Sequence, residues 1–487
     1  NTFPDKGLRS TSRSRDISAL STKVCDFLHG TRREAAASHE WGRPGRSNPS
    51  RHFDYSLAPP DAEETPVPGV TNAFYAQSGG VTAVINASAA GVIETARQHP
   101  ERIGTVFAGH RGILGALTED LIDTGQESAA DIAALKDTPG GAFGSCRYKL
   151  QEIATDPSQY ERLIEVFRAH NIGYFFYNGG GDSADTCLKV SQLGESMGYP
   201  VQAIHIPKTI DNDLPNTDCS PGFGSAAKYV ATSVREVGLD VESMCSTSTK
   251  VFILEVLGRH AGWTVAAGGL AGSSEAQPPH LLLFPEIRFE AEPFLVRVRD
   301  CVATYGYCVI VASEGLRRSN GDYVADADSH DAFGHQQLGG VAATLATLIR
   351  TQLGFKVHHA LADYMMRAAR HLASAIDLDQ AYAVGKAAVD YALAGRSGIM
   401  VSIQRMADDP YEWTLGEAEL TGVANIEKTM PASYISDDGY HITDACRRYL
   451  QPLIQGERTP PFVNGLPRPV RLKKIRVDKK TGRDFPV

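Results

Sequence analysis

The chain has 487 residues, of which 42% are apolar and 22% charged, with a net charge of −9 and a pI near 5.9. This composition is ordinary for a globular protein, and the length suggests about three domain-sized units. The negative charge argues against a nucleic acid or an anionic membrane as the partner, so an anionic ligand would have to be bound by local cations. No apolar run approaches the ~20 residues that a membrane span needs.

Eight cysteines are scattered along the chain, and none forms a C-x-x-C pair. Paired cysteines are common ligands of structural zinc, and disulfides are typical of oxidising compartments. The pattern therefore argues against a structural zinc site and favours a reducing, cytoplasmic location.

Residues 1–69 differ from the rest of the chain. They are rich in Ser, Arg and Pro and show little apolar periodicity, which is typical of disordered segments. A transit peptide is a weaker interpretation, because acidic residues are mixed in and there is no apolar signal core. We expect a disordered or mis-assigned leader over 1–69 and a fold that begins near Thr71.

From residue 71 onward, short apolar segments alternate with helical patterns, which predicts mostly parallel sheets with helices on both faces. Strands are expected over 73–77, 104–108, 174–177, 201–206, 250–256, 280–284, 307–312 and 398–404. Helices are expected over 82–96, 159–170, 184–193, 225–237, 261–271, 292–305, 338–353, 365–374, 379–394 and 442–453. Residues 460–469 are expected to form an extended tail.

Two Gly-rich corners each join an expected strand to an expected helix. The first is Ser78-Gly79-Gly80, and the second runs from Gly179 to Ser183. Glycines let the backbone approach a phosphate, and a following helix N-terminus offers free N–H groups. A single corner of this kind is also explained by a tight turn, but two favour phosphate binding. Neither fits the P-loop or the full G-x-G-x-x-G pattern.

A third polar segment, Lys208-Thr209-Ile210-Asp211-Asn212-Asp213, follows the apolar run 201–206. Catalytic groups of α/β sheets lie just beyond the carboxyl ends of strands. A cation beside carboxylates suits phosphoryl transfer to an alcohol, because one group takes the hydroxyl proton and the other offsets charge on the moving phosphoryl group. The alternative interpretation is a polar turn with an Asx hydrogen bond.

Taken together, these segments resemble those of the phosphofructokinase family, and of its pyrophosphate-dependent branch in particular. The resemblance spans residues 72 to 472. The motifs that carry it are Ser78-Gly79-Gly80, 140–147 with Arg147 at its end, 179–183, 208–213, Leu257-Gly258-Arg259 and Ser313-Glu314-Gly315. It implies a catalytic region over 70–472, built of two Rossmann-like α/β lobes with a cleft between them, and a C-terminal tail over 473–487.

The resemblance also implies roles for the residues that handle the phosphoryl group. Asp211 would take the proton from the 1-hydroxyl of fructose 6-phosphate, and Asp213 would support it or link to a metal. Arg147 would reach the transferring phosphoryl group. Donor phosphates would lie against Gly79, Gly80, Gly180 and Gly181.

Two residues indicate which donor is used. ATP-dependent members carry Gly where this chain has Asp182 and Lys208. Lys208 would neutralise a donor that offers no adenosine to bind. Asp182 would lie where a nucleotide's α-phosphate goes, and two like charges about 4 Å apart cost roughly 4 kcal/mol at an effective dielectric near 20. We therefore expect pyrophosphate as the donor.

One departure from the family concerns Mg²⁺, the expected cofactor. Family members usually bind it through an Asp at the position of Gly181. Asp182 could take over as the metal ligand. Alternatively, Mg²⁺ could arrive bound mainly to pyrophosphate, since this ion often keeps several waters.

The resemblance implies a sugar site from several further segments. Arg259 and Arg367 would bind the sugar phosphate, and Glu314 would accept fructose hydroxyls. The remaining sugar contacts would come from Thr209, Ile210, Leu257, Gly258 and Tyr364. We expect a homodimer or homotetramer.

Two other functions stay open at this point. The first is an ATP-dependent phosphofructokinase that tolerates Asp182 and Lys208. The second is a non-catalytic regulatory subunit that binds sugar phosphate, which Gly181 keeps possible, although the intact Asp211, Arg147, Arg259 and Arg367 argue against it.

Overall fold

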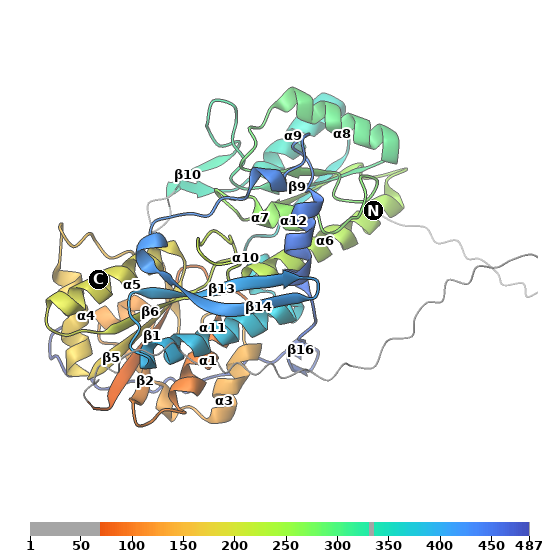
Figure 1. Ribbon diagram of the computed structural model, residues 1–487. Coiled ribbons are helices and arrows are strands. Elements are labelled where there is room, and N and C mark those ends of the chain that lie inside the picture. Colours follow the sequence, from red (N-terminus) through yellow and green to blue (C-terminus); the bar gives the residue numbers. More distant parts are fainter. Residues whose placement is uncertain (1–68, 331–335, 487) are drawn as a thin grey trace, which may run out of the picture. The chain divides into compact units, whose positions relative to one another are not determined.

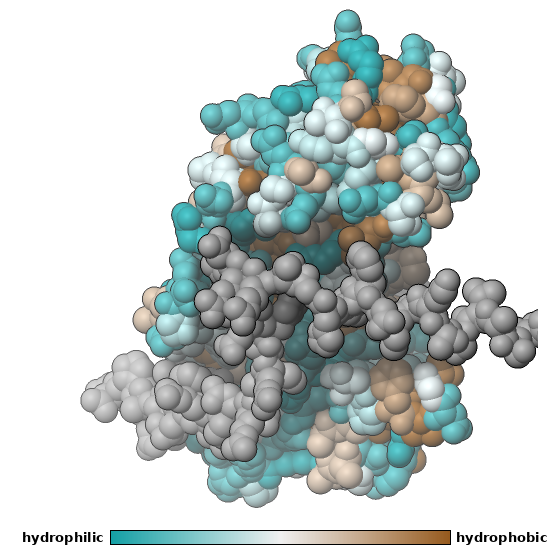
Figure 2. All heavy atoms as spheres, turned by 90° about the vertical axis from the view of Figure 1, so that its right-hand side faces the viewer, coloured by the Kyte–Doolittle hydropathy of each residue, from teal (hydrophilic) through white to brown (hydrophobic). Residues whose placement is uncertain are grey.

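The structure is a computed structural model that describes residues 69–330 and 336–486. Every described residue belongs to a single compact unit of the chain. Among the described residues, no helix combines the length and the apolar character that crossing a membrane would require. The face seen in Figure 2 is largely hydrophilic, with smaller apolar areas between the polar ones.

The larger sheet has eight strands in the order β14-β13-β6-β5-β1-β2-β3, with β4 paired to the end of β1 (Figure 1). The central strands run parallel, whereas β3 and β14 pair antiparallel with their neighbours. The strands are β1 (Thr71–Ser78), β2 (Ile103–Gly109), β3 (Leu121–Asp123), β4 (Ser145–Cys146), β5 (Ile172–Gly179), β6 (Gln202–Pro207), β13 (Ile399–Asp408) and β14 (Tyr411–Glu419).

Both faces of this sheet are buried, which explains why its strands are continuous apolar runs. On β1, Tyr75 joins the core on one face, while Phe74 joins a separate core on the other. The helices are α1 (Ile85–Ala96), α6 (Phe223–Met244) and α11 (Ala375–Leu393) on the first face, and α2 (Ile113–Leu117), α4 (Ser158–Ala169) and α5 (Gly181–Ser196) on the second. The short α3 (Ala129–Ala133) lies beside α1.

Helices α1 and α11 cross with their backbones in contact. A Cβ added at Gly91 would collide with the Tyr382 carbonyl, and one added at Gly385 would collide with the Ser88 carbonyl. Glycine is therefore required on both helices by the close approach, although it disfavours a helix interior by about 1 kcal/mol relative to Ala.

The second sheet has four parallel strands in the order β12-β7-β9-β8. They are β7 (Val251–Val256), β8 (Leu281–Leu283), β9 (Cys308–Ser313) and β12 (Val357–Leu361). The helices near them are α7 (Trp263–Gly268), α8 (Ala291–Tyr305), α9 (Val341–Leu353) and α10 (Asp363–Ala368). This arrangement confirms the predicted two-sheet α/β class. Beyond short 3-10 turns, the described residues also form α12 (Asp444–Leu450) and two small antiparallel pairs, β10 (Asp326–His330) with β11 (Gln336–Leu338) and β15 (Phe462–Val463) with β16 (Leu466–Pro467).

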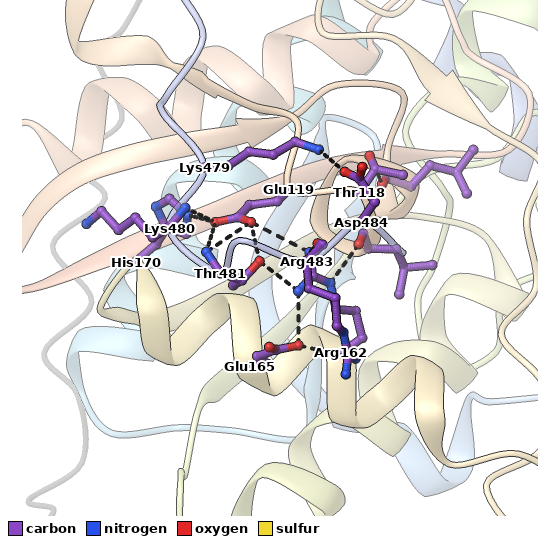
Figure 3. A network of polar contacts seen from close by, with 12 residues as sticks. Thr118, Glu119, Arg162, Glu165, His170, Lys479, Lys480, Thr481, Arg483 and Asp484 are labelled. Atoms are coloured by element: carbon purple, nitrogen blue, oxygen red, sulfur yellow. Dashed lines mark hydrogen bonds and ion pairs between the residues drawn. The ribbon is translucent and has the colours of Figure 1, made fainter. Parts of the chain in front are cut away.

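Residues 473–486, which we call the C-terminal strap, lie along the edge strand β3. The N–H of Val477 donates to the Leu121 carbonyl, and the Asp123 N–H donates to the Ile475 carbonyl, both at 2.9 Å. Figure 3 shows the end of the strap, where Glu119 accepts hydrogen bonds from the Lys480 N–H and the Thr481 hydroxyl. The strap therefore covers an edge that would otherwise expose unpaired backbone groups.

The predicted strands and most predicted helices are confirmed with shifts of a few residues at their ends. The extended tail over 460–469 is instead a short hairpin, because Asn464 and Gly465 adopt the positive φ of a tight turn (+52° and +79°). The leader over 1–69 lies outside the described residues except for Gly69. The proposed domain boundaries stay a prediction.

Candidate active site

The strand order β6-β5-β1 places three polar segments at one edge of the larger sheet. β1 ends at Ser78, β5 at Gly179 and β6 at Pro207, and these strands are parallel neighbours. Both Gly-rich corners and the segment 208–213 therefore emerge side by side, as is usual for sites in α/β sheets.

Lys208 connects the two corners. Its backbone N–H donates to the Gly179 carbonyl at 3.0 Å, and its Nζ donates to the Gly80 carbonyl at 2.7 Å. Gly79 has a φ of +70°, and a Cβ added there would lie 3.5 Å from the same Nζ. The two glycines thus leave room for the lysine side chain across the end of β1.

The environment of Lys208 disfavours its charge. Its exposed fraction is 4%, and burial lowers its pKa to about 8, with Arg147 and Arg367 adding to the shift and Asp211 opposing it. A buried lysine among other cations is poised to bind an anion, because an incoming phosphate would replace the lost hydration.

Two guanidinium groups lie beside the first Gly-rich corner. A Cβ added at Gly80 would lie 2.5 Å from Nη1 of Arg367 and 3.5 Å from Nη2 of Arg147. Arg147 follows β4, and Arg367 comes from α10. Together with Lys208 they form a group of three cations, which we call the cationic cluster, on a chain whose net charge is −9.

Asp211 is the carboxylate next to this cluster. Its backbone N–H donates to the Thr209 hydroxyl at 3.1 Å, and that hydroxyl lies 3.4 Å from Oδ2 of Asp211. Burial raises the pKa of Asp211, and Lys208, the Thr209 hydroxyl and Arg147 oppose that shift. Ile210, between them in sequence, is buried with 8% exposed. The segment therefore holds a carboxylate in a fixed turn beside cations.

Asn212 adopts a left-handed conformation with a φ of +54°. Its amide nitrogen donates to the Tyr449 hydroxyl at 2.9 Å, and its amide oxygen accepts from the Ser220 N–H at 3.0 Å. For Asp213, the next residue, burial together with the negative charges of Asp211 and Glu427 raises the pKa to about 7. Asp211, Asp213 and Glu427 thus lie near one another as an acidic group.

The second sheet contributes Gly258, Arg259 and Glu314 at the ends of β7 and β9. The Gly258 N–H donates to Glu314 Oε1 at 3.4 Å, and the Ser313 hydroxyl donates to the Gly258 carbonyl at 2.6 Å. Burial raises the pKa of Glu314 to about 7, and nearby Asp211 and Arg259 act on it in opposite directions. Glu314 of the second sheet is therefore within electrostatic range of Asp211.

The neighbouring Leu257 is half-buried, and its carbonyl accepts from the Thr264 hydroxyl. Tyr364 is 61% exposed. The Arg367 guanidinium carbon lies 3.6 Å from the centroid of the Tyr364 ring, which is a cation–π contact. The predicted contacts of Leu257, Tyr364 and Arg367 with the sugar stay predictions.

Asp182, in the first turn of α5, forms an ion pair with Lys149 at 3.1 Å. The two side chains are 39% and 42% exposed. Next to it, a Cβ added at Gly181 would meet nothing within 4 Å. Gly180 is the residue before the helix and is in an extended conformation. Space thus exists for the carboxylate that the family usually carries at the position of Gly181.

Sequence reasoning missed Lys149 and Glu427. Lys149 could have been noticed because it is two residues after Arg147, and alternate residues of an extended segment face the same side. Glu427 offered no signal, since it is more than two hundred residues from Asp211 in the sequence. Among the described residues, no group of three or more His, Cys, Asp or Glu side chains is arranged to hold a metal ion.

This arrangement can bind a phosphate dianion between the glycine backbone and the cationic cluster. The buried carboxylate of Asp211 could then activate a phosphoryl acceptor that is bound against the second sheet. Comparisons with known proteins agree with that chemistry. The family model described as "Phosphofructokinase" matches residues 72–390.

Several relatives are similar along most of the chain. A pyrophosphate–fructose 6-phosphate 1-phosphotransferase of Halomonas elongata is 66% identical over 409 residues, which is 84% of this chain and 98% of that protein. One of the same name from Methylococcus capsulatus is 63% identical over 416 residues, or 85% and 99% of the two chains.

The crystal structure of a pyrophosphate-dependent phosphofructokinase from Marinobacter aquaeolei is similar to the described fold. It has a TM-score of 0.79 at 61% identity and covers 86% of this chain and 100% of its own. The corresponding structure from Nitrosospira multiformis also gives 0.79, at 58% identity, with 86% and 100% covered. On this similarity and the family match, the chain belongs to the phosphofructokinase family.

Proposed function

We propose that this protein transfers a phosphoryl group from pyrophosphate to the 1-hydroxyl of fructose 6-phosphate, giving fructose 1,6-bisphosphate and phosphate. The observation that carries the proposal is Lys208, whose buried ammonium binds the first Gly-rich corner while its backbone N–H binds the second, and whose charge is supported by Asp211. Relatives named for this reaction, at 57–66% identity over at least 84% of the chain, support it.

The acceptor is activated by Asp211. Its carboxylate takes the proton of the 1-hydroxyl as the oxygen attacks the nearer phosphorus in line, and a positioned base of this kind contributes about 10²- to 10⁴-fold. Lys208 and Arg147 offset the negative charge on the phosphoryl group as it moves. The second phosphate leaves from the side of the Gly-rich corners.

The sugar lies against the second sheet in this proposal. Glu314 accepts hydrogen bonds from fructose hydroxyls, with the backbone of Leu257 and Gly258 beside it, and Arg259 and Arg367 bind the 6-phosphate. Because the phosphoanhydride consumed and the phosphate ester formed carry comparable energies, the same residues serve the reverse direction, and the reaction suits both glycolysis and gluconeogenesis.

Mg²⁺ is the proposed cofactor, and its chemistry is to neutralise part of the charge of pyrophosphate. The residues fit a metal held mainly by the substrate and by water, because Asp182 is already paired with Lys149 and Gly181 has no side chain. The alternative is that Asp182 leaves Lys149 and serves as a protein ligand of the metal. We also propose a cytoplasmic location and a homodimer or homotetramer.

The test compares donors on the purified protein. A coupled assay should give a kcat/KM with pyrophosphate at least a hundredfold above that with ATP. A higher value with ATP would contradict the proposal. Replacing Asp182 and Lys208 by Gly together should admit ATP, and no gain in ATP turnover would contradict the assignment of these two residues to donor choice.

A further inference from the structure

An ion pair joins Lys149 to Asp182, and the segments that carry these two residues flank the carboxyl end of β1. β4 pairs with Gln77 and Ser78 at the end of β1, and β5 pairs with β1 along the opposite edge. Lys149 lies three residues beyond β4, and Asp182 lies three residues beyond β5. An ion pair of 3.1 Å between them therefore joins the segments that follow the two neighbours of the β1 end, from which the Gly79-Gly80 corner emerges.

Two lysines thus reach this corner from opposite sides. Lys208 comes from the end of β6, and its Nζ extends past β5 to the Gly80 carbonyl. Lys149 comes from the β4 side and extends to the first turn of α5. A ligand resting on Gly79 and Gly80 would have one ammonium at each end.

Arg147 and Lys149 are both exposed, whereas Tyr148 is half-buried and Leu150 is buried. The two exposed residues are separated by one position in a segment that continues from β4 without helical structure. In extended backbone such residues project to the same side. Arg147 lies beside Gly80, so Lys149 continues the cationic cluster outward.

We propose that Lys149 binds the outer phosphate of pyrophosphate, the one that leaves, and that it does so as a pair with Asp182. The inference rests on the proposed function. In the free protein Asp182 keeps the lysine extended over the corner, which reduces the side-chain entropy lost on binding. The same pair closes the side of the site on which a nucleotide would continue beyond its second phosphate.

The pairing also changes how Asp182 acts on the donor. A lone carboxylate would repel pyrophosphate as well as ATP, because both are anions. With Lys149 beside it, the local charge is balanced, and the carboxylate retains its bulk and its hold on the lysine. In this proposal the intact Lys149–Asp182 ion pair blocks the rest of a nucleotide, whereas pyrophosphate is short enough to bind without displacing the pair.

The experiment measures steady-state kinetics in both directions for Lys149→Ala and Lys149→Arg. Lys479→Ala is the matched control, because Lys479 is about as exposed as Lys149 and forms an ion pair of similar length (3.0 Å) with Asp484 in the strap. For Lys149→Ala, the KM for pyrophosphate and the reverse-direction KM for phosphate should rise about tenfold or more, the effect of one lost charge-assisted hydrogen bond.

The KM values for both sugar phosphates should stay within twofold in the same variant, and Lys149→Arg should recover most of the pyrophosphate affinity. A pyrophosphate KM within twofold of the unmodified protein, or equal rises for pyrophosphate and sugar, would overturn the proposal. If turnover is too low to measure, calorimetric titration with pyrophosphate replaces the KM values.

A second variant tests the pair itself. Adding Asp182→Asn to Lys149→Ala should lower the pyrophosphate KM again, because it removes the carboxylate left without a cation. Asp182→Asn is also measured alone. If the rise in pyrophosphate KM of the double variant equals the product of the rises in the two single variants, the residues act independently and the pairing is overturned. If the unmodified protein showed no turnover with pyrophosphate, the proposed function itself would fail, and that result is distinct from any difference among the variants.

Discussion

At the residue scale, the conformation of Asn212 decides where the two carboxylates of the 208–213 segment lie. Its left-handed φ of +54° is held by the Tyr449 hydroxyl and the Ser220 N–H. Asn tolerates this conformation better than most residues. The backbone therefore reverses between Asp211 and Asp213, and both remain in one acidic group.

Asp211→Asn is expected to lower kcat by about 10²- to 10⁴-fold while the KM values change little, since the amide cannot accept the hydroxyl proton. Rapid-quench or coupled assays with pyrophosphate measure this. Asp484→Asn serves as the control, because Asp484 is exposed and pairs with Lys479 in the C-terminal strap. A kcat that falls less than tenfold in Asp211→Asn would show that another group is the base.

The lowered pKa of Lys208 predicts a dependence on pH. The ammonium is charged below its pKa of about 8 and neutral above it, so kcat/KM for pyrophosphate should fall as the pH rises through about 8 to 9. Lys208→Arg keeps its charge at these pH values, and its profile should lack that alkaline fall. An identical fall in both proteins would assign the ionisation to another group or to the substrate.

The site was predictable where one local segment carries it. Lys208, Asp211 and the two Gly-rich corners could be predicted because each lies in a short segment whose residue types and spacing suit a turn at the end of a strand. Glu427 could not be predicted, because only the packing of distant segments brings it to Asp213. The pairing of Asp182 with Lys149 was hidden for the same reason, and it replaces a lone negative charge by a balanced pair.

At the element scale, the C-terminal strap stabilises a buried charge. Glu119 is 1% exposed with a φ of +55°. Burial alone would raise its pKa, but hydrogen bonds from the Lys480 N–H, the Thr481 hydroxyl and N–H, and His170 lower it to about 2. Buried Arg162 lies 3.6 Å from the same carboxylate (Figure 3).

Glu119→Gln should therefore destabilise the fold by about 3 kcal/mol near neutral pH, the value of a shift from 4.5 to about 2. The stabilisation from a lowered carboxyl pKa is complete above the unfolded value of 4.5 and is lost as the pH falls toward 2. The difference in unfolding free energy between the two proteins should shrink over that window in denaturant titrations. Lys479→Ala, which removes an exposed pair, should change stability by less than about 1 kcal/mol. A pH-independent difference would contradict this account.

The elements that sequence predicted best are the strands buried on both faces, such as β5 and β9, because continuous apolar runs mark them. The strands β12 and β14 were missed. β12 lies at the edge of its sheet, and the exposed His358 and His359 interrupt its apolar pattern. β14 pairs with β13 in a hairpin, is largely half-exposed, and contains several acidic residues and Gly416. Their pairing is decided by a neighbouring strand and not by their own composition.

At the scale of the whole molecule, the family match begins at residue 72, and 84% of this chain covers 98% of the Halomonas relative. A protein that starts at Gly69 should accordingly keep kcat and both KM values within twofold. Kinetics of the shortened and full-length proteins, at equal concentrations of folded protein, provide the check. A loss of more than tenfold would show that the first 68 residues take part in the reaction.

The closing of β3 by the C-terminal strap has a consequence for synthesis on the ribosome. Strands β13 and β14 of the larger sheet come from residues 399–419, and the partners of Glu119 come from residues 480 and 481. A nascent chain that has already emerged through β5 and β6 therefore holds an incomplete sheet and a carboxylate whose partners have not yet been translated. Domains generally fold as units during synthesis, yet this lobe is complete only after residues 480 and 481 have been translated. A prematurely terminated product would expose that edge to quality-control proteases.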